Sequence, residues 1–568
     1  MNDSQDAILA IFPPEVMSCI LSYLGADLVD LWSCCLVNKD WYSLTTPLLW
    51  NRPSFNSQSS YLAFKDTILN NPKARRYVND FSFDMYMYQI RSIEEISNLV
   101  SLLPNLKFIS LPFVNLLPVP TTFLRHVAYK ALPGLRRLHY RDTRISFRRV
   151  LQDLCSVLAG CTELQELAVD LDTDYPLLHN LDMNEIDVLP TSPLKSLSLR
   201  CVHSSSVLVE RILIHTPDLE HLSFTMVQIS DSFTENLWKS CPKLKSLEIE
   251  LTYSDSNRYT PIEMLCHRLA QVYQGQLKQL KLCFHREPYV PQLVLNELWR
   301  NHGPHLESLE LCRFTISHKS LACLAQNISP TLKRLCLSNI MEIRKPPFDV
   351  WETLLSKCGG SLQVLHLDSN ASFNDEIASI VAKHCHKLRE LSLKRTWTSD
   401  IAVKKILETN GKTLRILNLS KTSISGDTIS EITKQCSYIT DLNVEWPRWT
   451  EACAEVPLSA TEFVEFIRLH GGHLEALNID RWPITNLTLE AIAKYGRGLK
   501  VLTFRDNGAL SDKYLREIMK SCKKLQRLYI LLSYPYTVEG LSYEVLTEVQ
   551  NRYIDYFAEV DGIRTFYS

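Results

Sequence analysis

The string Leu-x-x-Leu-x-Leu recurs along most of this chain with a period of about 28 residues. Leu244-Leu247-Ile249, Leu306-Leu309-Leu311 and Leu388-Leu391-Leu393 are plain examples. A fixed period of this length predicts a stack of short structural units, each of which buries its apolar face only against its neighbours. Because such a stack can grow unit by unit, a chain of 568 residues does not need several separate globular cores.

The first apolar positions of the strings define seventeen repeats. They are Val78, Leu106, Leu135, Leu164, Leu194, Leu219, Leu244, Leu277, Leu306, Leu332, Leu362, Leu388, Leu414, Ile439, Leu474, Leu499 and Leu525. The last two apolar residues of each string alternate as in a half-buried β-strand. Asn374, Asp400 and Asp512 precede apolar residues at helical spacing, so we expect them to cap short amphipathic helices. The sequence therefore predicts an α/β solenoid with a parallel sheet inside and helices outside.

Cysteine and glycine share one position of the repeat, three residues before its first leucine. Cysteine stands there at Cys161, Cys241, Cys385, Cys436 and Cys522, and glycine at Gly303, Gly359, Gly411, Gly471 and Gly496. We expect this position to require a small residue at a helix end, where glycine relieves backbone strain and cysteine acts as a small buried hydrophobe. Although the chain contains 17 cysteines, the thiols at this position are predicted to be reduced and structural.

The spacing Cys-x-x-Leu-x-x-Leu-x-Leu, with Ser-Asp or Asn-Asp before the helix, resembles the cysteine-containing subfamily of leucine-rich repeats. The resemblance covers residues 78–531 and is best in the later repeats. The early repeats lack the Ser-Asp start, so we expect their outer side to be irregular.

Residues 12–50 do not share the period, and their apolar residues are spaced as in three short helices. Pro14 fits the first turn of the first helix, Asp27 and Asn38 are placed to begin the next two, and Pro47 predicts the end of the third. Three helices in about 40 residues are too few to bury this many apolar side chains. The module either caps the first repeat or presents an apolar face to a partner.

The string Phe12-Pro13-Pro14-Glu15, followed by Ile20-Leu21, Leu36-Val37 and Pro47-Leu48-Leu49-Trp50, is similar to the F-box motif. Phe12 stands where the family usually has leucine, which keeps an apolar group. The resemblance implies docking on the Skp-family adaptor of a cullin-RING ubiquitin ligase, a helix face lying in an apolar groove. The residues that match the docking pattern are Pro13, Pro14, Glu15, Ile20, Leu21, Leu24, Leu28, Leu36, Val37 and Trp41. Spacing alone leaves open which of them face the adaptor and which face the interior of the module.

Two features of the later repeats predict a surface for a target protein. Asn418, Asn443 and Asn478 occupy the same strand position in three consecutive repeats, so their amides are expected to form a row. The longest step of the array runs from Ile439 to Leu474, and loops of this region are rich in tryptophan, which is common in binding hot spots. These tryptophans are Trp397, Trp446, Trp449 and Trp482. The alternative is that they only cover seams between repeats.

Charged residues change in sign along the predicted inner face of the sheet, from basic in the early repeats to acidic in the middle ones. Early repeats place Arg137, His139, Arg141 and Arg200 there, and middle repeats place Glu248, Glu250 and Glu310. This pattern either steers a partner of opposite charge or is a solvated mixed face. Lysine or arginine also follows the first apolar residue in nine repeats, as an anion-binding rim or as long side chains that cover the sheet edge. The formal net charge of -2 disfavours general binding to nucleic acid or to anionic membranes.

No stretch approaches the roughly 18 apolar residues that a membrane helix needs, and the acidic start does not resemble a secretory signal. We therefore expect the cytoplasm or the nucleus. The sequence lacks Gly-x4-Gly-Lys-Ser/Thr, His-Glu-x-x-His, Gly-x-Ser-x-Gly and Cys-x-x-Cys motifs. His384-Cys385-His386 has no second ligand pair for a metal. We expect no catalytic residue, metal or cofactor.

The sequence thus predicts an F-box at 8–50, a connecting segment at 51–77, a leucine-rich-repeat array at 78–531 and a C-terminal cap at 532–568. The predicted function is that of a non-catalytic receptor of an SCF-type cullin-RING ubiquitin ligase, which joins a Skp-family adaptor to an unknown target protein. One alternative is a repeat scaffold that acts outside a ubiquitin ligase. The other is an enzyme with a site in the hollow of the arc, which the missing motifs disfavour.

Overall fold

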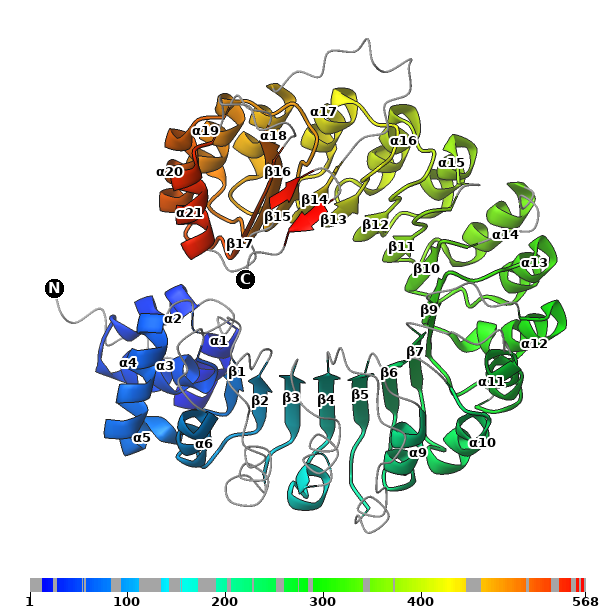
Figure 1. Cartoon of the computed structure of the whole chain (residues 1–568), viewed down its shortest axis with the longest axis horizontal. Coiled ribbons are helices and arrows are strands. Elements are labelled where there is room, and N and C mark those ends of the chain that lie inside the picture. Colours follow the sequence, from blue (N-terminus) through cyan, green and yellow to red (C-terminus); the bar gives the residue numbers. More distant parts are fainter. Residues whose placement is uncertain are drawn as a thin grey trace. The chain divides into compact units, whose positions relative to one another are not determined.

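The computed structural model forms two compact units, Met1–Asp255 and Ser256–Ser568. The residues it describes are 13–23, 28–53, 55, 58–82, 93–111, 134–142, 154, 156–171, 191–201, 206–226, 229–251, 260–273, 275–284, 290–340, 348–370, 373–445, 461–506, 510–532, 541–552, 558–560 and 563–565. Each unit contains consecutive parallel strands with helices against one face of the sheet (Figure 1). The predicted leucine-rich-repeat solenoid with an α-helical module before it is therefore confirmed.

The helical module comprises α1 (Pro14–Ser22), α2 (Leu28–Cys35) and α3 (Lys39–Asn51) in the first unit. Helices α1 and α2 both pack on α3, and Met17, Leu21 and Leu31 are buried in the module. Asn38 caps α3 as predicted, because its Oδ1 accepts the backbone N–H of Trp41 at 2.9 Å. The other predicted cap, Asp27, lies outside the described residues.

The predicted end of the third helix before Pro47 is wrong, because α3 continues to Asn51. Proline removes one hydrogen bond to the preceding turn, so another interaction must hold the last turn of α3 in place. The Trp50 ring stacks on Phe64, with ring centroids 5.8 Å apart. Tertiary packing therefore overrides the local preference of proline.

The predicted connecting segment contains two helices, α4 (Gln58–Asn70) and α5 (Pro72–Arg75), which lead into β1 (Asp80–Ser82). Phe55, Phe64 and Phe81 form an aromatic cluster with ring centroids 5.0 to 6.0 Å apart, which joins α4 to β1. Arg52, just after α3, pairs with Asp80 at 2.8 Å. The helical module is thus attached to the first repeat by packing and by charge.

Every predicted repeat start precedes a strand by two residues, from Val78 before β1 to Leu525 before β17. The first unit continues with β2 (Phe108–Leu111), β3 (Arg137–Asp142), β4 (Glu166–Leu171), β5 (Ser196–Cys201), β6 (His221–Met226) and β7 (Ser246–Leu251). The second contains β8 (Gln279–Phe284), β9 (Ser308–Cys312), β10 (Arg334–Ser338), β11 (Val364–His366), β12 (Glu390–Ser392), β13 (Ile416–Asn418), β14 (Asp441–Asn443), β15 (Ala476–Asn478), β16 (Val501–Asp506) and β17 (Arg527–Leu532). Neighbouring strands within each unit pair in parallel.

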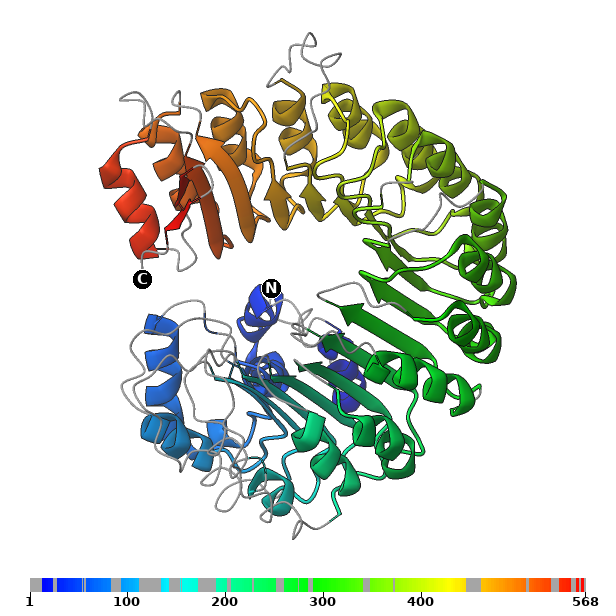
Figure 2. The ribbon, with the colours of Figure 1, turned by 45° about the vertical axis from the view of Figure 1, so that its right-hand side comes forward.

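Helices lie on one face of each sheet, and we call the other face the open face (Figure 2). In the first unit they are α6 (Ile93–Ser101), α9 (Ser206–Ile214) and α10 (Asp231–Ser240). In the second they are α11 (Thr260–Gln271), α12 (Gln292–His302), α13 (His318–Asn327), α14 (Phe348–Cys358), α15 (Asp375–His384), α16 (Asp400–Asn410), α17 (Gly426–Gln435), α18 (Thr461–His470), α19 (Asn486–Tyr495) and α20 (Asp512–Ser521). The predicted irregular outer side of the early repeats falls largely outside the described residues. None of the helices that the structure describes is long and apolar enough to span a bilayer.

The polar residues at the helix starts join neighbouring repeats. Asn374 caps α15 as predicted. Asp400 and Asp512 do not cap, since they are the first residues of α16 and α20 and bond the repeat that follows. Asp400 Oδ1 accepts the backbone N–H of Ser425 at 2.8 Å, and Asp512 Oδ1 accepts that of Ser542 at 2.8 Å. The carboxylates stay at helix N-termini, where the helix dipole favours them.

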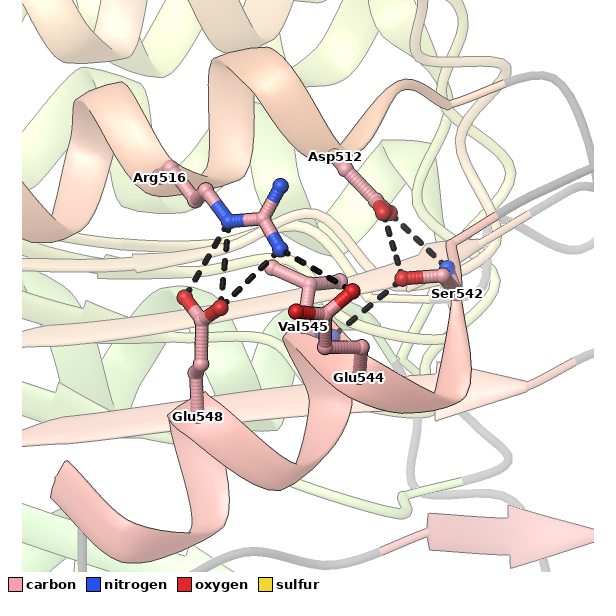
Figure 3. Close-up of polar contacts among 6 residues, drawn as sticks. All are labelled: Asp512, Arg516, Ser542, Glu544, Val545 and Glu548. Carbon is pink, nitrogen blue, oxygen red and sulfur yellow. Dashed lines mark hydrogen bonds and ion pairs between the residues drawn. The ribbon is translucent and has the colours of Figure 1, made fainter.

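The segment after the last repeat packs onto α20 through α21 (Tyr543–Arg552) (Figure 3). Arg516 of α20 pairs with Glu548 at 2.9 Å and with Glu544 at 3.8 Å. The Ser542 hydroxyl caps α21 by accepting the N–H of Val545 at 3.2 Å. Beyond the helix, β18 (Ala558–Val560) pairs with β17, and β19 (Ile563–Thr565) pairs antiparallel with β18. This segment therefore continues both layers of the second unit.

The position shared by cysteine and glycine is tight, but backbone strain is not the reason. Gly303 and Gly411 have φ of -45° and -53°, which any residue adopts. A Cβ at Gly411 would lie 2.7 Å from the carbonyl oxygen of Gln435 in the next repeat. The carbonyl oxygen of Leu407 in its own helix lies equally close, at 2.7 Å. Glycine is therefore favoured at Gly411 because a Cβ would crowd both its own helix and the next repeat. The cysteines at this position are buried, and burial raises the pKa of Cys161 to about 11 and that of Cys241 to about 12.

Two adjacent glycines test this explanation. A Cβ at Gly471 would lie 2.6 Å from the carbonyl oxygen of Ile467 and 2.8 Å from that of Tyr495 in the next repeat, whereas a Cβ at Gly472 would meet nothing within 4 Å. Gly471→Ala is therefore expected to destabilise the protein by about 1–3 kcal/mol, and Gly472→Ala by less than about 0.5 kcal/mol. Thermal unfolding followed by circular dichroism measures both. Equal unfolding temperatures for the two variants would contradict the close-approach explanation.

Candidate functional site

The helical module exposes large apolar side chains on α1, on α2 and just after each of them. Val16 and Ile20 lie one turn apart on α1, and Trp32 and Leu36 are spaced by four residues at α2. The exposed fractions of Ile20, Trp32 and Leu36 are 47%, 59% and 71%. We call the set of Val16, Ile20, Tyr23, Trp32, Leu36 and Val37 the helical apolar face, and all six are exposed.

The residues predicted to bind an adaptor divide into several groups. Those exposed are Pro13, Glu15, Ile20, Leu36 and Val37, and Trp41 is half-buried. Leu21, only 2% exposed, lies in the interior of the module, so it supports the fold rather than offering a docking surface. Leu24 lies outside the described residues, and for Pro14 and Leu28 only the helical backbone is described. Adaptor binding by the exposed residues stays a prediction.

Val16, Tyr23 and Trp32 are not among the predicted docking residues, although they are as exposed as Ile20, Leu36 and Val37. Neighbouring residues of a helix point in different directions, so Leu31 and Trp32 cannot both face the interior. Leu31 is fully buried and Trp32 is exposed. The sequence of α2 contains more apolar residues than one helix face can bury. This excess was the signal that some of them, such as Trp32, must be exposed.

The predicted asparagine row exists on the open face of the second unit. Asn418 pairs with Asn443, and Asn443 pairs with Asn478, in parallel register. Each Oδ1 accepts the backbone N–H two residues further on, at 3.0 to 3.1 Å. The side-chain oxygens therefore fix the bend where each strand ends. Among the residues that the structure describes, the amide N–H groups of the row have no hydrogen-bond acceptor.

The four predicted tryptophans do not share one surface. Trp482 is 3% exposed, and its Nε1 donates to the carbonyl of Val444 at 2.6 Å. Its ring also packs edge-on against Phe463, so Trp482 covers a seam between repeats rather than offering a binding surface. Trp397 is half exposed. Trp446 and Trp449 lie outside the described residues.

Charged side chains on the open face of the second unit are linked across strands. Arg334 lies 3.7 Å from Glu310 and 3.8 Å from Glu390, and Lys281 lies 3.3 Å from Glu310. His366 Nε2 lies 2.7 Å from Glu390 Oε1. Burial opposes the charged imidazole, but hydrogen bonds with Cys336 and Glu390 outweigh it and raise the pKa of His366 to about 10.

Asp441 differs from these residues, because among the described residues it makes no ion pair. Its Oδ2 accepts the hydroxyl of Thr440 at 2.8 Å. Burial raises the pKa of Asp441, and the nearby Glu475 and Glu390 carboxylates add to this effect. In the sheet Asp441 lies between Ile416, which is 38% exposed, and Ala476. Thr440 and the more distant Lys500 oppose this rise in pKa only in part. This part of the open face therefore combines a partly buried carboxylate with apolar surface.

Three of the lysines that follow the first leucine, Lys245, Lys333 and Lys500, pair with a glutamate of the preceding repeat. Lys245 binds Glu220 at 2.7 Å, and Lys333 binds Glu307 at 2.8 Å. Such exposed pairs contribute little to stability, but they neutralise the predicted basic rim. On the open face of the first unit, His139 likewise lies 2.7 Å from Glu166. These contacts favour the mixed, solvated face over an anion site.

Nothing in the described part of the chain forms a group of three or more metal-ligating side chains. In the sequence His384-Cys385-His386, Cys385 is fully buried and His384 lies 2.9 Å from Glu352. His384 is therefore a hydrogen-bond partner of Glu352.

The profile of the F-box-like family matches residues 9–56, which include α1, α2 and α3. The chain contains an F-box-like domain. It is also 38% identical over 68 residues to "F-box protein COS111" of Candida glabrata. That alignment covers 12% of this chain and 7% of the relative, so the chain spans only a small part of that protein's length.

Two solved structures show a distant likeness to the chain that contains this F-box-like domain. The Rad7 and Elc1 complex in yeast has 15% identity and a TM-score of 0.40, over 64% of this chain and 82% of that one. The TLR13–ssRNA13 complex has 13% identity and a TM-score of 0.31, over 86% and 77%. These similarities are too low to carry an inference about function.

The imidazole of His366 provides a test of the open-face charges. With its folded-state pKa raised to about 10, the His366–Glu390 pair stabilises the fold fully below the ordinary histidine pKa of about 6.5. That stabilisation is lost as the pH rises through the folded-state pKa. In a histidine-labelled sample, the His366 resonance is expected not to shift between pH 5 and 8, and to titrate in that range in Glu390→Gln. Titration near pH 6.5 in the wild type would contradict the assignment.

Proposed function

We propose that this protein is the substrate-receptor subunit of an SCF-type cullin-RING ubiquitin ligase. The F-box-like domain binds a Skp-family adaptor, and the repeats hold a target protein. The observation that most supports the proposal is the helical apolar face, which lies within the residues that match the F-box-like profile.

The exposed side chains are large enough to drive association. Fully burying one such side chain contributes about 1.5–3 kcal/mol, and clustered exposed apolar residues mark interaction sites in soluble proteins. The face is also supported from behind, because α1 and α2 both pack on α3. A surface that is already ordered loses less conformational entropy when it binds.

The proposal assigns no chemical step to this chain. A receptor raises the rate of a transfer reaction by keeping the target near the catalytic subunits, which replaces a bimolecular encounter by a nearly intramolecular one. The transfer chemistry belongs to the other subunits of the ligase.

A scaffold that acts outside a ubiquitin ligase is the second candidate. It is favoured by the contacts that attach α3 and α4 to β1, because a helical module that only caps the first repeat would make the same contacts. The two candidates differ in one property, since only the receptor requires the helical apolar face to bind an adaptor.

Substitution of the exposed Ile20 tests adaptor binding. Ile20→Asp places a charge in the helical apolar face and is expected to weaken binding of a purified Skp-family adaptor by at least 30-fold, or about 2 kcal/mol. Leu62→Asp is the matched control, because Leu62 is similarly exposed but lies on α4. Calorimetric titration of the full-length variants measures both affinities. Leu21→Asp is unsuitable, since Leu21 is buried and its replacement would unfold the module.

If the wild-type chain binds no Skp-family adaptor while its fold is intact, the scaffold is the better description. If Ile20→Asp and Leu62→Asp weaken binding equally, the adaptor does not use α1.

We further propose that the target binds the open face of β12 to β16. Three features support this surface: the carboxylate of Asp441, the exposed Ile416 beside it, and the amide N–H groups of the asparagine row. The carboxylate favours a target segment with lysine or arginine, and the amides can donate to its backbone carbonyls. Trp482 has no part in this surface, because it is buried.

Ile416→Asp is expected to lower the recovery of target proteins about tenfold or more in proximity labelling, since it replaces apolar contact by a second carboxylate. Leu487→Asp is the control, because Leu487 is exposed on α19 on the opposite side of the sheet. Adaptor binding should be the same in both variants. Unchanged recovery of the same proteins with Ile416→Asp would exclude this part of the open face.

A further inference from the structure

Two cysteines face each other on the open face of the second unit. Cys283 of β8 and Cys312 of β9 are directly opposed in parallel register. Their preceding residues, Leu282 and Leu311, are buried beneath the helices, so the alternation of a strand places both thiols on the open face. Neither cysteine occupies the small-residue position before a repeat.

The two thiols are in contact. The thiol of Cys283 shares a hydrogen bond with Cys312, and its Sγ also lies 3.9 Å from Glu310 Oε1. The hydrogen bond to Cys312, burial and the nearby Glu310 carboxylate hold the pKa of Cys283 well above its ordinary value. Cys283 therefore keeps its proton, and its thiol donates to Glu310 Oε1.

The strand spacing permits a covalent bond between them. Neighbouring strands lie about 4.7–4.9 Å apart, and disulfides join residues whose Cα atoms are about 4.4–6.8 Å apart. The two Cβ atoms leave the same face of the sheet, as the bond requires. Bonded Cβ atoms lie about 3.8 Å apart, so the strands must draw together slightly, and a strained disulfide is the more easily reduced.

We propose that Cys283 and Cys312 form a reversible disulfide when the protein meets a peroxide. This oxidation site is independent of adaptor binding and goes beyond the proposed receptor function.

The reaction balances with hydrogen peroxide as the oxidant. The Cys312 thiol loses its proton, the resulting thiolate attacks one peroxide oxygen and the O–O bond breaks. Cys312 becomes a sulfenic acid, and the released hydroxide combines with the lost proton to give water. The Cys283 sulfur then attacks the Cys312 sulfur and loses its proton. The oxygen of the sulfenic acid takes up that proton and leaves as water. In sum, two thiols and one peroxide give one disulfide and two waters.

The positions of the two cysteines fit these different roles. Cys312 is half-buried and so is reachable by a small oxidant, whereas Cys283 is 9% exposed. The sulfenic acid on Cys312 would therefore be met by a neighbouring thiol before further oxidation. Cys336 on the next strand cannot replace Cys283, because it is opposed to Glu310 and not to Cys312.

The bond would close a ring that contains α12 and joins two consecutive repeats. A cross-link of this kind removes conformational freedom from the unfolded chain, so oxidation is expected to raise the temperature of unfolding. It would also remove both thiols from the open face near Lys281 and Glu310, which are themselves paired.

The test treats the full-length protein with hydrogen peroxide, alkylates remaining thiols and identifies linked peptides by mass spectrometry. Most wild-type molecules are expected to carry a 283–312 link that dithiothreitol reverses. Cys283→Ser and Cys312→Ser should give no such link. Cys336→Ser is the matched control on the same face and should behave as the wild type. Thermal unfolding should shift upward on oxidation only in the wild type and in Cys336→Ser.

The exposed Cys19 shows whether the oxidant was effective. If Cys19 is oxidised while Cys283 and Cys312 remain unlinked, or if each is oxidised separately, the proposal is overturned. A link from Cys312 to Cys336 would overturn it as well. Circular dichroism before treatment establishes that each serine variant is folded. If Cys312→Ser is not folded, Cys312→Ala replaces it in the test.

Discussion

A strand of this protein cannot satisfy its own backbone hydrogen bonds, so each repeat depends on its neighbours. The backbone N–H of Lys333 donates to Glu307, that of Gln363 to Lys333 and that of Arg389 to Gln363, each at 2.8 Å. The same spacing brings helix ends into contact, which is why a Cβ at Gly411 has no room. It also brings equivalent charges together, so that Lys333 meets Glu307 through its side chain too. The close approach of consecutive repeats thus determines backbone, packing and surface charge.

The repeat starts could be predicted because they depend only on local alternation. Because each repeat must bury a leucine-type residue, these residues recur about every 28 positions in the sequence. A strand follows each predicted repeat start from Val78 to Leu525. Features that depend on a neighbouring element could not be predicted in this way. Helix α3 passes Pro47 because Trp50 stacks on Phe64, and Trp482 is buried because Val444 of the preceding repeat accepts its N–H. Neither contact is visible in the spacing of one segment.

The candidate sites show the same division. The asparagine row follows from the period, but its oxygens are engaged in the bend after each strand, which only the structure shows. In the helical module, spacing identified the apolar residues but not their direction, so Leu21 was grouped with Ile20 although one is buried and the other exposed. A three-helix module has too little interior for all its apolar side chains. The residues left outside are therefore the best guide to where a partner binds.

Repetition also explains how a reactive pair can arise without a dedicated motif. Cys283 and Cys312 occupy the same position of consecutive repeats, six residues after the first leucine, and the fold places equivalent positions at strand spacing. The next repeat has Ser338 there, which is opposed to Cys312 and ends the run of thiols. The pair is therefore implicit in the period, although five other cysteines of the repeats are buried and serve packing alone. In a solenoid, a side chain is best read together with its equivalents one repeat away, because those residues are its neighbours in space.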